Sequence, residues 1–328
     1  MNRSLHSIAI SAGLAIASGA ALAQTKSEPQ SYPARPIRII VPNTGGSGMD
    51  NVTRIIGARF TEAWGQQIVV DNRPGAGGII GHEIAAKAVP DGYTLLFSAS
   101  AGVVIQPLIT KVSYDSRRDF TPISLVVNSI QMLVTHPSVA AGTVEELMTL
   151  ARAKPGQLNC GSSGAGGSNH LACEMLKVMG GVDFVHVPFK GTVPQMIGIA
   201  GGQVHFGFAS IPTTMVFVKQ GKMRALAQGG ATRSAVVPNV PAVAETYPDF
   251  RAVTWYALFA PRGTPPAIVS RLNAEVVKIL SDPSIARRLA DQGLDPAPST
   301  PAELTAHMRA ETERFSRIIK MAGVTTAQ

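Results

Sequence analysis

The stretch VPNTGGSGMDNVTR, residues 41–54, decides the fold because a turn with three glycines joins an apolar strand directly to a helix. The same arrangement returns in LNCGSSGAGGSNHLA, residues 158–172. Glycine allows the backbone to adopt conformations that other residues avoid and to approach a ligand closely. Each turn can therefore hold an anion, expose a nucleophile or only redirect the chain, and the rest of the sequence has to decide among these.

Short apolar runs alternate with helical stretches in the first third of the chain. This βαβαβ rhythm predicts a parallel sheet that helices cover on both faces. The expected strands are 37–41, 67–71 and 94–98, and the expected helices are 50–64 and 81–88.

A second α/β series begins at Thr143, where the sequence TVEE forms a capping box for a helix that ends near residue 153. Three C-terminal helices follow it, and each is expected to open with a capping residue and then proline, at Thr264, Asp282 and Thr300. Within the second series, the expected strands are 157–160, 184–187, 204–208 and 224–227, and the expected helices are 168–179, 193–200 and 213–219.

Two long extended segments, about 123–135 and 250–261, flank the second series and suggest that the chain crosses twice between two domains. Domain 1 is then discontinuous, and a hinged pair of this kind commonly encloses a ligand. The expected division is a signal peptide at 1–23, domain 1 at 24–129 and 252–328, and domain 2 at 130–251.

The N-terminus and the composition set the compartment and exclude one class of partner. An apolar stretch after Arg3 and the sequence ALA at 21–23 indicate a secretory signal peptide with cleavage after Ala23, so we expect a periplasmic protein. The net charge of +8 is spread over 328 residues with no Lys/Arg run above two, and only 5% of residues are aromatic. These features argue against nucleic-acid binding.

The chain has two cysteines, Cys160 at the end of an expected strand and Cys173 in the next helix. An exported protein permits a bridge, but a disulfide needs Cα atoms within about 7 Å. A helix normally packs further than that above its sheet. The sequence thus favours two buried thiols, although the start of the helix leaves the disulfide open.

The residues of the first turn favour a structural role for its acid. Ser47 is a plausible N-cap, Asp50 closes a capping box three residues later, and Arg54 can pair with Asp50 one turn on. We therefore prefer a structural interpretation of Asp50 over contact with a ligand.

In the second turn, serine hydroxyls add hydrogen-bond donors, and Ser168 can double as the N-cap. His170 is interpreted as a structural hydrogen-bonding group, with no neighbouring side chain expected to orient it. A thiol at Cys160 or the hydroxyl of Ser163 together with His170 would suit an exported hydrolase. The turn lacks the G-x-S-x-G spacing of a nucleophile elbow, which weakens that alternative.

Other cofactor motifs are weak or missing. The chain contains no G-x-x-x-x-G-K-[ST] sequence, and GAGGIIG at 75–81 lacks the surroundings of a dinucleotide site. The seven histidines are scattered, and there is no Cys-x-x-Cys, so we expect no metal and no cofactor. What remains is a pair of neutral turns whose backbone N–H groups and helix N-termini hold a small anion, with each charge-assisted bond contributing about 1.5–3 kcal/mol.

Several segments are similar to those of a known family. CGSSGAGGSNHLACEML, VPFKGTVPQMIGIAGGQVHFGF and the specific block NRPGAGG…PDGYTLLF resemble the Bug receptors, the periplasmic solute-binding components of tripartite tricarboxylate transporters. The resemblance extends from about Tyr32 to the C-terminal helices. It implies a type II periplasmic binding fold with two α/β domains, a hinge and a Venus-flytrap ligand cleft. It also implies a small carboxylate ligand, and membrane subunits of such a transporter or a sensor kinase as partners of a monomer.

The resemblance implies a set of ligand-binding residues on the turns of both domains. Asn43 departs from the apolar or aromatic residue that many members carry there, so the ligand cannot be copied from a typical member. Met49 looks tolerant of an apolar or ring-bearing ligand, and Lys190 either meets the far end of a dianion or is a solvated surface charge. The expected residues are Pro42, Asn43, Thr44, Gly45, Gly46, Ser47, Met49, Asp50, Ser98, Ala99, Ser100, Ser162, Ser163, Gly164, Gly167, Ser168, His170, Phe189, Lys190, Ala209 and Ser210.

The leading hypothesis is thus a non-enzymatic periplasmic receptor for a small carboxylate. The alternative is the exported hydrolase with Cys160 or Ser163 and His170. A third class, an interaction or sensory module without a small-molecule ligand, predicts that no small acid raises the melting temperature.

Overall fold

The computed structural model describes residues 32–323, and the described residues from Pro33 onward form one compact unit. The predicted signal peptide lies outside the described residues. Within the described part of the chain, no helix has both the length and the apolar character needed to cross a membrane.

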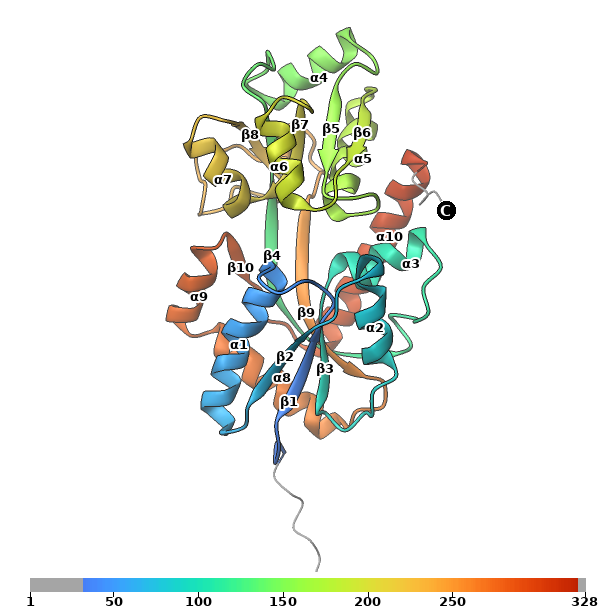
Figure 1. Cartoon of the computed structure of the whole chain (residues 1–328), viewed down its shortest axis with the longest axis vertical. Coiled ribbons are helices and arrows are strands. Elements are labelled where there is room, and N and C mark those ends of the chain that lie inside the picture. Colours follow the sequence, from blue (N-terminus) through green and yellow to red (C-terminus); the bar gives the residue numbers. More distant parts are fainter. Residues whose placement is uncertain (1–31, 324–328) are drawn as a thin grey trace, which may run out of the picture. The chain divides into compact units, whose positions relative to one another are not determined.

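A ten-stranded sheet forms the centre of the compact unit, in the order β2-β1-β3-β9-β4-β7-β5-β6, with β8 and β10 also paired to β4 (Figure 1). The predicted parallel pairing of the first three strands is confirmed, since β1 lies between β2 and β3 and is parallel to both. The strands are β1 Ile37–Val41, β2 Ile68–Asn72, β3 Thr94–Ala99, β4 Phe120–Thr135, β5 Asn159–Ser162, β6 Val185–Pro188, β7 Phe206–Ser210, β8 Arg224–Gln228, β9 Val253–Pro261 and β10 Leu294–Pro296.

Helices cover the sheet in both lobes. We call the part with β1–β3, β10, α1–α3 and α8–α10 the first lobe, and the part with β5–β8 and α4–α7 the second lobe. A π-helical turn at Ala101–Ile105 precedes α3 and was not predicted. The α-helices are α1 Gly48–Trp64, α2 Ile79–Ala86, α3 Gln106–Ile109, α4 Val144–Ala153, α5 Ser168–Gly180, α6 Thr192–Ala200, α7 Ile211–Lys219, α8 Pro266–Leu280, α9 Pro283–Ala290 and α10 Pro301–Ala322.

Two strands run from one lobe to the other, β4 and β9 (Figure 1). The residues of β4 up to Ile130 pair with β9, whereas those from Gln131 onward pair with β7 and β8 of the second lobe. The pairing partner of β4 thus changes between Ile130 and Gln131, one residue beyond the predicted domain boundary at 129/130. The domain boundaries themselves stay a prediction.

The alternation of side chains along β4 connects the strand to two hydrophobic clusters. Leu133 belongs to the larger cluster, which includes Phe206 and Phe208. Met132 and Val134 point to the opposite face and pack in a second cluster beneath α6 and α7. A strand that is apolar on both faces is what a sheet covered by helices on two sides requires.

Of the four helix caps predicted for α4, α8, α9 and α10, three were correct and one was wrong. Thr143, Asp282 and Thr300 cap α4, α9 and α10 through their side chains as predicted. The proposed cap at Thr264 was wrong, because Pro265 is the N-cap and α8 begins at Pro266. Two successive prolines suit the non-helical N-cap and the first helical position, whose N–H groups need no partner.

Cys160 and Cys173 form a disulfide, so the preference for two free thiols was wrong. Cys173 lies in the second turn of α5, near the point where this helix leaves the sheet, and its Cα is 6.4 Å from that of Cys160. The distance between a helix and its strand is smallest near their connecting turn, which brings the two residues within bridging range.

Candidate functional site

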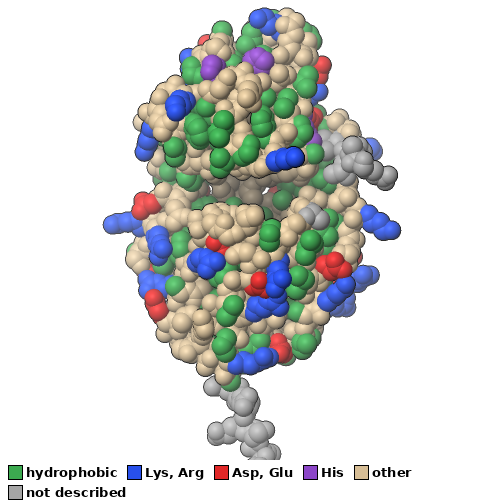
Figure 2. Space-filling model, viewed as in Figure 1, with side chains coloured by type: hydrophobic (Ala, Val, Ile, Leu, Met, Phe, Trp, Pro, Cys, Tyr) green, Lys and Arg blue, Asp and Glu red, His purple; other side chains and the backbone are tan. Residues whose placement is uncertain are grey.

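A cavity of about 680 Å³ opens between the two lobes (Figure 2). Its walls come from the first lobe, from the crossing strands β4 and β9, and from the second lobe. In that order, the lining residues are Asn43, Thr44, Gly45, Gly46, Ser47, Gly48, Met49 and Ala99; Ser129, Gln131, Thr254 and Tyr256; and Ser163, Ser168, Asn169, Gly191, Thr192, Val193, Ala209, Ser210 and Thr213.

The structure brings about half of the expected site residues together in this cavity. Those that line it are Asn43, Thr44, Gly45, Gly46, Ser47, Met49, Ala99, Ser163, Ser168, Ala209 and Ser210. Those that lie outside its lining are Pro42, Asp50, Ser98, Ser100, Ser162, Gly164, Gly167, His170, Phe189 and Lys190.

The first lip, residues 43–49, is held by an acid behind it. Asp50 is only 2% exposed, and its Oδ2 accepts hydrogen bonds from the Gly46 N–H (2.8 Å) and from Arg54 Nε (3.0 Å). Burial opposes ionisation of Asp50, but the hydrogen bonds from Arg54 and Gly46 outweigh it and hold the pKa below its ordinary value. The expected capping box is therefore only half correct, because the carboxylate reaches Gly46 rather than the N-cap Ser47.

The amides that remain for a ligand in the first lip are those of the first helical residues. Ser47 Oγ accepts a hydrogen bond from the Asp50 N–H. The N–H groups of Gly48 and Met49 precede that position and have no acceptor one helical turn earlier. Both residues line the cavity, so this end of α1 offers backbone donors to an anion.

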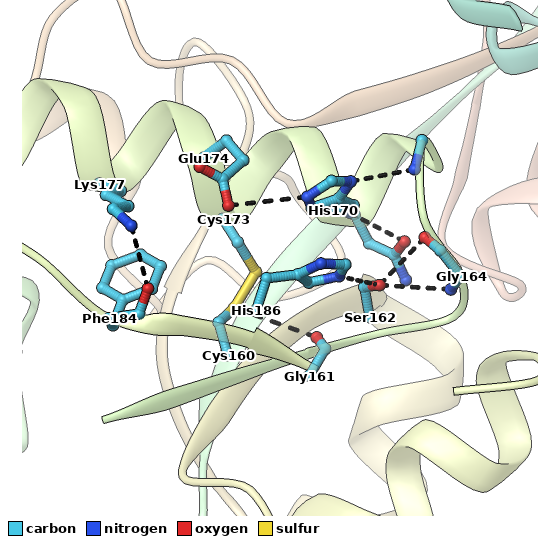
Figure 3. A network of polar contacts seen from close by, with 12 residues as sticks. Cys160, Gly161, Ser162, Gly164, His170, Cys173, Glu174, Lys177, Phe184 and His186 are labelled. Carbon is cyan, nitrogen blue, oxygen red and sulfur yellow. Dashed lines mark hydrogen bonds and ion pairs between the residues drawn. A yellow bond between two sulfur atoms is a disulfide. The ribbon is translucent and has the colours of Figure 1, made fainter. Parts of the chain in front are cut away.

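The second lip, residues 161–170, is held from behind by two imidazoles (Figure 3). His170 Nδ1 accepts a hydrogen bond from the Gly166 N–H (2.9 Å), and His186 Nε2 contacts Ser162 Oγ (2.6 Å). The same Ser162 oxygen accepts a hydrogen bond from the Gly164 N–H (3.2 Å). These residues support the lip instead of facing the cavity. From the sequence alone, the supporting residues of the turn cannot be distinguished from those that face the cavity.

Two expectations about this lip were wrong. Ser168 is the first residue of α5 and does not cap it, since the N-cap is Gly167. His170 does have a neighbour that orients it, because Glu174 Oε1 lies 3.6 Å from His170 Nε2 one helical turn later.

A buried amide network positions Asn169, a cavity residue that sequence analysis missed. Its Nδ2 donates to Ser163 Oγ and to Gln195 Oε1, each at 3.0 Å. Gln195 is fully buried and donates in turn to the carbonyls of Gly161 and Phe208. An asparagine in the first turn of a helix after a glycine-rich loop was the signal available in the sequence.

The crossing strands contribute the floor of the cavity, which the sequence analysis also missed. Gln131 is 4% exposed, and its Nε2 donates to Ser168 Oγ (2.9 Å) and Thr254 Oγ1 (3.0 Å). The Thr254 hydroxyl also donates to Ser168 (2.9 Å). Burial raises the pKa of the neighbouring Tyr256 to about 12, so its hydroxyl is neutral. The signal was a polar pair, Ser129 and Gln131, at alternate positions of an apolar strand.

The cavity has no charged side chain among its lining residues, yet four helices begin at it. The N-terminal residues of α1 and α5 line it directly, and so do the N-caps of α6 and α7, Gly191 and Ser210. Helix N-termini carry partial positive charge and unpaired N–H groups. The arrangement therefore favours an anion without a fixed cation, and the exposed Lys190 lies outside the lining.

The geometry does not assemble a nucleophile or a metal site. Cys160 is oxidised in the disulfide, Ser163 is bonded to Asn169, and His170 Nδ1 is occupied by Gly166. Within residues 32–323, no cluster of three or more His, Cys, Asp or Glu side chains could hold a metal ion.

Comparisons with known proteins identify the family to which the chain is similar. Residues 52–324 match the model of the tripartite tricarboxylate transporter family receptor, TctC. The chain is 36% identical to the UPF0065 protein in the tcbD-tcbE intergenic region of Pseudomonas sp. (strain P51), over 93% of each chain. It is 33% identical to protein BugT of Bordetella pertussis, over 89% of this chain and 90% of that one.

The chain is also similar to solved structures of such receptors along most of its length. Rpa4515 of R. palustris with adipate is 33% identical, with a TM-score of 0.82 over 90% of this chain and 99% of that one. MatC (Rpa3494) from Rhodopseudomonas palustris with bound malate is 30% identical, with a TM-score of 0.77 over 88% of this chain and 100% of that one. The periplasmic binding protein BugD is 30% identical, with a TM-score of 0.77 over 90% of this chain and 99% of that one.

Proposed function

Because the chain belongs to the family of tripartite tricarboxylate transporter receptors, we propose that it captures a small organic carboxylate in the cavity between its lobes. The expected fold, a two-domain α/β periplasmic binding protein, is confirmed by its similarity to the solved receptors. The family consists of solute-binding receptors, so the hydrolase alternative is not supported.

One observation carries the proposal for this cavity: four helix N-termini meet at a lining that contains no acidic or basic side chain. Each N-terminus stabilises a nearby anion by about 0.3–1 kcal/mol, and each backbone N–H to a carboxylate contributes about 1.5–3 kcal/mol. A few such bonds from both lobes offset the entropic cost of capture and give roughly micromolar affinity. Adipate and malate, which are bound in the two solved relatives, set the size class of the acid to be tested first.

The remaining parts of the proposal concern location and partners. Related receptors are periplasmic binding proteins, which supports export of this chain. We infer a monomer with domains divided at 129/130 and 251/252, and the change of pairing partner along β4 supports the first of these boundaries. The membrane subunits of a tripartite transporter, or a sensor kinase, would receive the loaded form.

A thermal-shift screen tests the proposal. Adipate, malate and a library of other small carboxylates are added to the purified protein, with the uncharged diamides of the same skeletons as matched controls. An acid at 100 times its Kd should add about 2.7 kcal/mol to the free energy of unfolding, while its diamide should add nothing. The proposal fails if no acid raises the melting temperature, or if the diamides act as well as the acids.

A second experiment addresses the hydrolase alternative. The protein is incubated with a panel of generic esters, and the same assay is repeated with His170→Ala. We expect no turnover by either protein, and turnover that disappears in the variant would refute the receptor assignment.

A further inference from the structure

The support of the second lip contains two stacked imidazoles whose chemistry the binding proposal does not use. The rings of His170 and His186 lie 3.6 Å apart between centroids and 15° from parallel (Figure 3). His170 is on α5 and 7% exposed, and His186 is on β6, sixteen residues further along the chain. Close to the cavity residues Ser163 and Ser168, Ser162 and Gly166 of the lip form hydrogen bonds with these two rings.

The Gly166 hydrogen bond fixes where the His170 ring carries its proton. The Gly166 N–H donates to His170 Nδ1, which must therefore present a lone pair, so the ring proton sits on Nε2 and faces Glu174 Oε1 at 3.6 Å. Ser162 Oγ lies 2.6 Å from His186 Nε2 and 3.0 Å from the Gly164 carbonyl oxygen, and its single proton can be donated to either of them.

Only one ring of such a pair can accept a further proton, because two cations at this separation repel each other. Burial, and after it the proximity of His170, lowers the pKa of His186 to about 4. His170 has the Glu174 carboxylate beside it. A proton added to His170 can be bound only at Nδ1, the acceptor of the Gly166 hydrogen bond, because Nε2 already carries one.

The neighbouring elements supply no other charged group to this pair. Beneath it, β5 contributes Cys160, which is tied to Cys173 and does not titrate. From α10, which packs on α5, Arg314 is held by Glu311 and reaches Met175. Glu174 and His186 are thus the titratable groups that the described structure places against His170.

We propose that His170 and His186 are positioning residues for the second lip, and that protonation of His170 at Nδ1 releases the Gly166 N–H and weakens carboxylate binding. This regulation rests on the proposed function of the cavity. A positively charged imidazole near the cavity would by itself attract an anion more strongly than the neutral ring does. The sign of the pH effect therefore distinguishes loss of the Gly166 hydrogen bond, which lowers affinity, from charge attraction, which raises it. Affinity falls on acidification if the hydrogen bond dominates.

Calorimetric titration of adipate and malate at about pH 7.5 and about pH 5 tests the sign. His170→Asn keeps an acceptor near the position of Nδ1 but cannot take a proton, so its affinity should show only the fall that protonation of the diacid itself causes toward pH 5. Wild-type affinity should fall roughly tenfold more than that of His170→Asn, the scale of one lost hydrogen bond to a positioned group. His170→Leu has no acceptor and should bind weakly at both.

Two further variants complete the design. His186→Gln preserves a donor for Ser162 and should bind with nearly wild-type affinity at the higher pH. His136→Asn changes a histidine in a loop outside the cavity lining and should keep the full pH dependence of the wild type. Wild-type affinity that is constant or rises on acidification, or a His170→Asn protein as acid-sensitive as the wild type, would overturn the proposal.

A measurement without any ligand keeps this inference separate from the proposed function. The amide proton of Gly166 is followed by NMR hydrogen exchange, expressed as protection relative to the intrinsic rate at each pH. Its protection should be lost on acidification in the wild type and retained in His170→Asn. If neither acid binds while Gly166 behaves in this way, the binding proposal fails and the positioning role stands; unchanged protection refutes the positioning role itself.

Discussion

Both lips lead into a helix whose N-terminal residues line the cavity, but the two lips are fixed by different chemistry. The first lip is held by Asp50, an ionised and buried carboxylate whose partners lie within one helical turn in the sequence. The second lip is held by neutral imidazoles and amides, and their partners come from β6 and α6. The glycine-rich sequence of a turn thus does not determine which side chains hold it in place. Here the first lip is held by a carboxylate that stays ionised near neutral pH, whereas the second lip is held by imidazoles, which can be protonated.

The largest expected effect is acid destabilisation, because the first lobe buries His82 and the second lobe partly buries His186. Burial is the main cause that lowers the pKa of both His82 and His186 to about 4. Between pH 6.5 and 4 the unfolded chain binds more protons than the folded one, so stability is complete above about pH 6.5 and falls as the pH drops toward 4. His82 alone accounts for up to about 3 kcal/mol of that loss, and the partly solvated His186 adds less.

Urea unfolding at a series of pH values measures this loss. His186→Gln should remove part of the pH dependence, because glutamine does not titrate and retains a hydrogen bond to Ser162. A free energy of unfolding that stays constant from pH 7 to 4 would contradict the lowered pKa of these two rings.

Removing the disulfide sharpens the comparison, since the bridge joins the residues on either side of the second lip and the first lip has no such bridge. The double variant Cys160→Ala/Cys173→Ala should lower the free energy of unfolding by about 3 kcal/mol, the entropy of closing a loop with a sequence separation of 13. Unfolding in urea with and without reductant measures it. The reductant should weaken the wild type and leave the variant unchanged, and an effect of less than about 1 kcal/mol would show that the bridge is not needed for stability.

The next largest effect is expected on ligand affinity, from backbone strain when Gly46 in the first lip is replaced. Gly46 has a φ of 77°, and an added Cβ would meet nothing within 4 Å, so a substitution acts through conformation and not through a clash. Gly46→Val should weaken adipate or malate binding roughly tenfold, because a β-branched residue at positive φ costs about 1–2 kcal/mol. Gly46→Asn is the matched control, since asparagine tolerates this region. Equal affinities of the two variants would show that the turn does not form part of the site.

Replacing the acid of the first lip should have a smaller effect. Asp50→Asn can still accept from Gly46 but loses its charge toward Arg54, which is half exposed, so we expect a loss of about 1 kcal/mol of stability. Urea unfolding measures it, and Arg54→Gln serves as the partner control. A loss above about 3 kcal/mol would mean that the carboxylate has a further buried role.

The smallest effect is expected at Lys190. This exposed side chain lies outside the cavity lining, and salt screens charges separated by more than about 8 Å of solvent. Lys190→Ala should change the Kd of adipate less than about twofold in calorimetry at physiological salt. A tenfold change would favour the alternative in which this lysine meets the far end of a dianion.

More of the fold and of the first lip could be predicted from the sequence than of the second lip. Ser47, Asp50 and Arg54 interact within one turn, and short-range patterns of this kind are visible in a single chain. His170 and His186 are sixteen residues apart, and Gln131 and Thr254 lie on strands distant in sequence, so only the folded sheet brings them to the lip and to the cavity floor. The disulfide was misjudged for a related reason, since an average helix-to-sheet spacing does not describe the first turns after a loop.

The uncharged lining of the cavity has a consequence for delivery. An acid gripped by a buried arginine would have to separate an ion pair before it could leave, and such a step slows departure steeply. Here the attraction comes from four fixed dipoles spread over both lobes, so we expect it to weaken gradually as the lobes part. If a membrane partner opens the two lobes, as proposed above, the bound acid can leave without breaking any single strong contact.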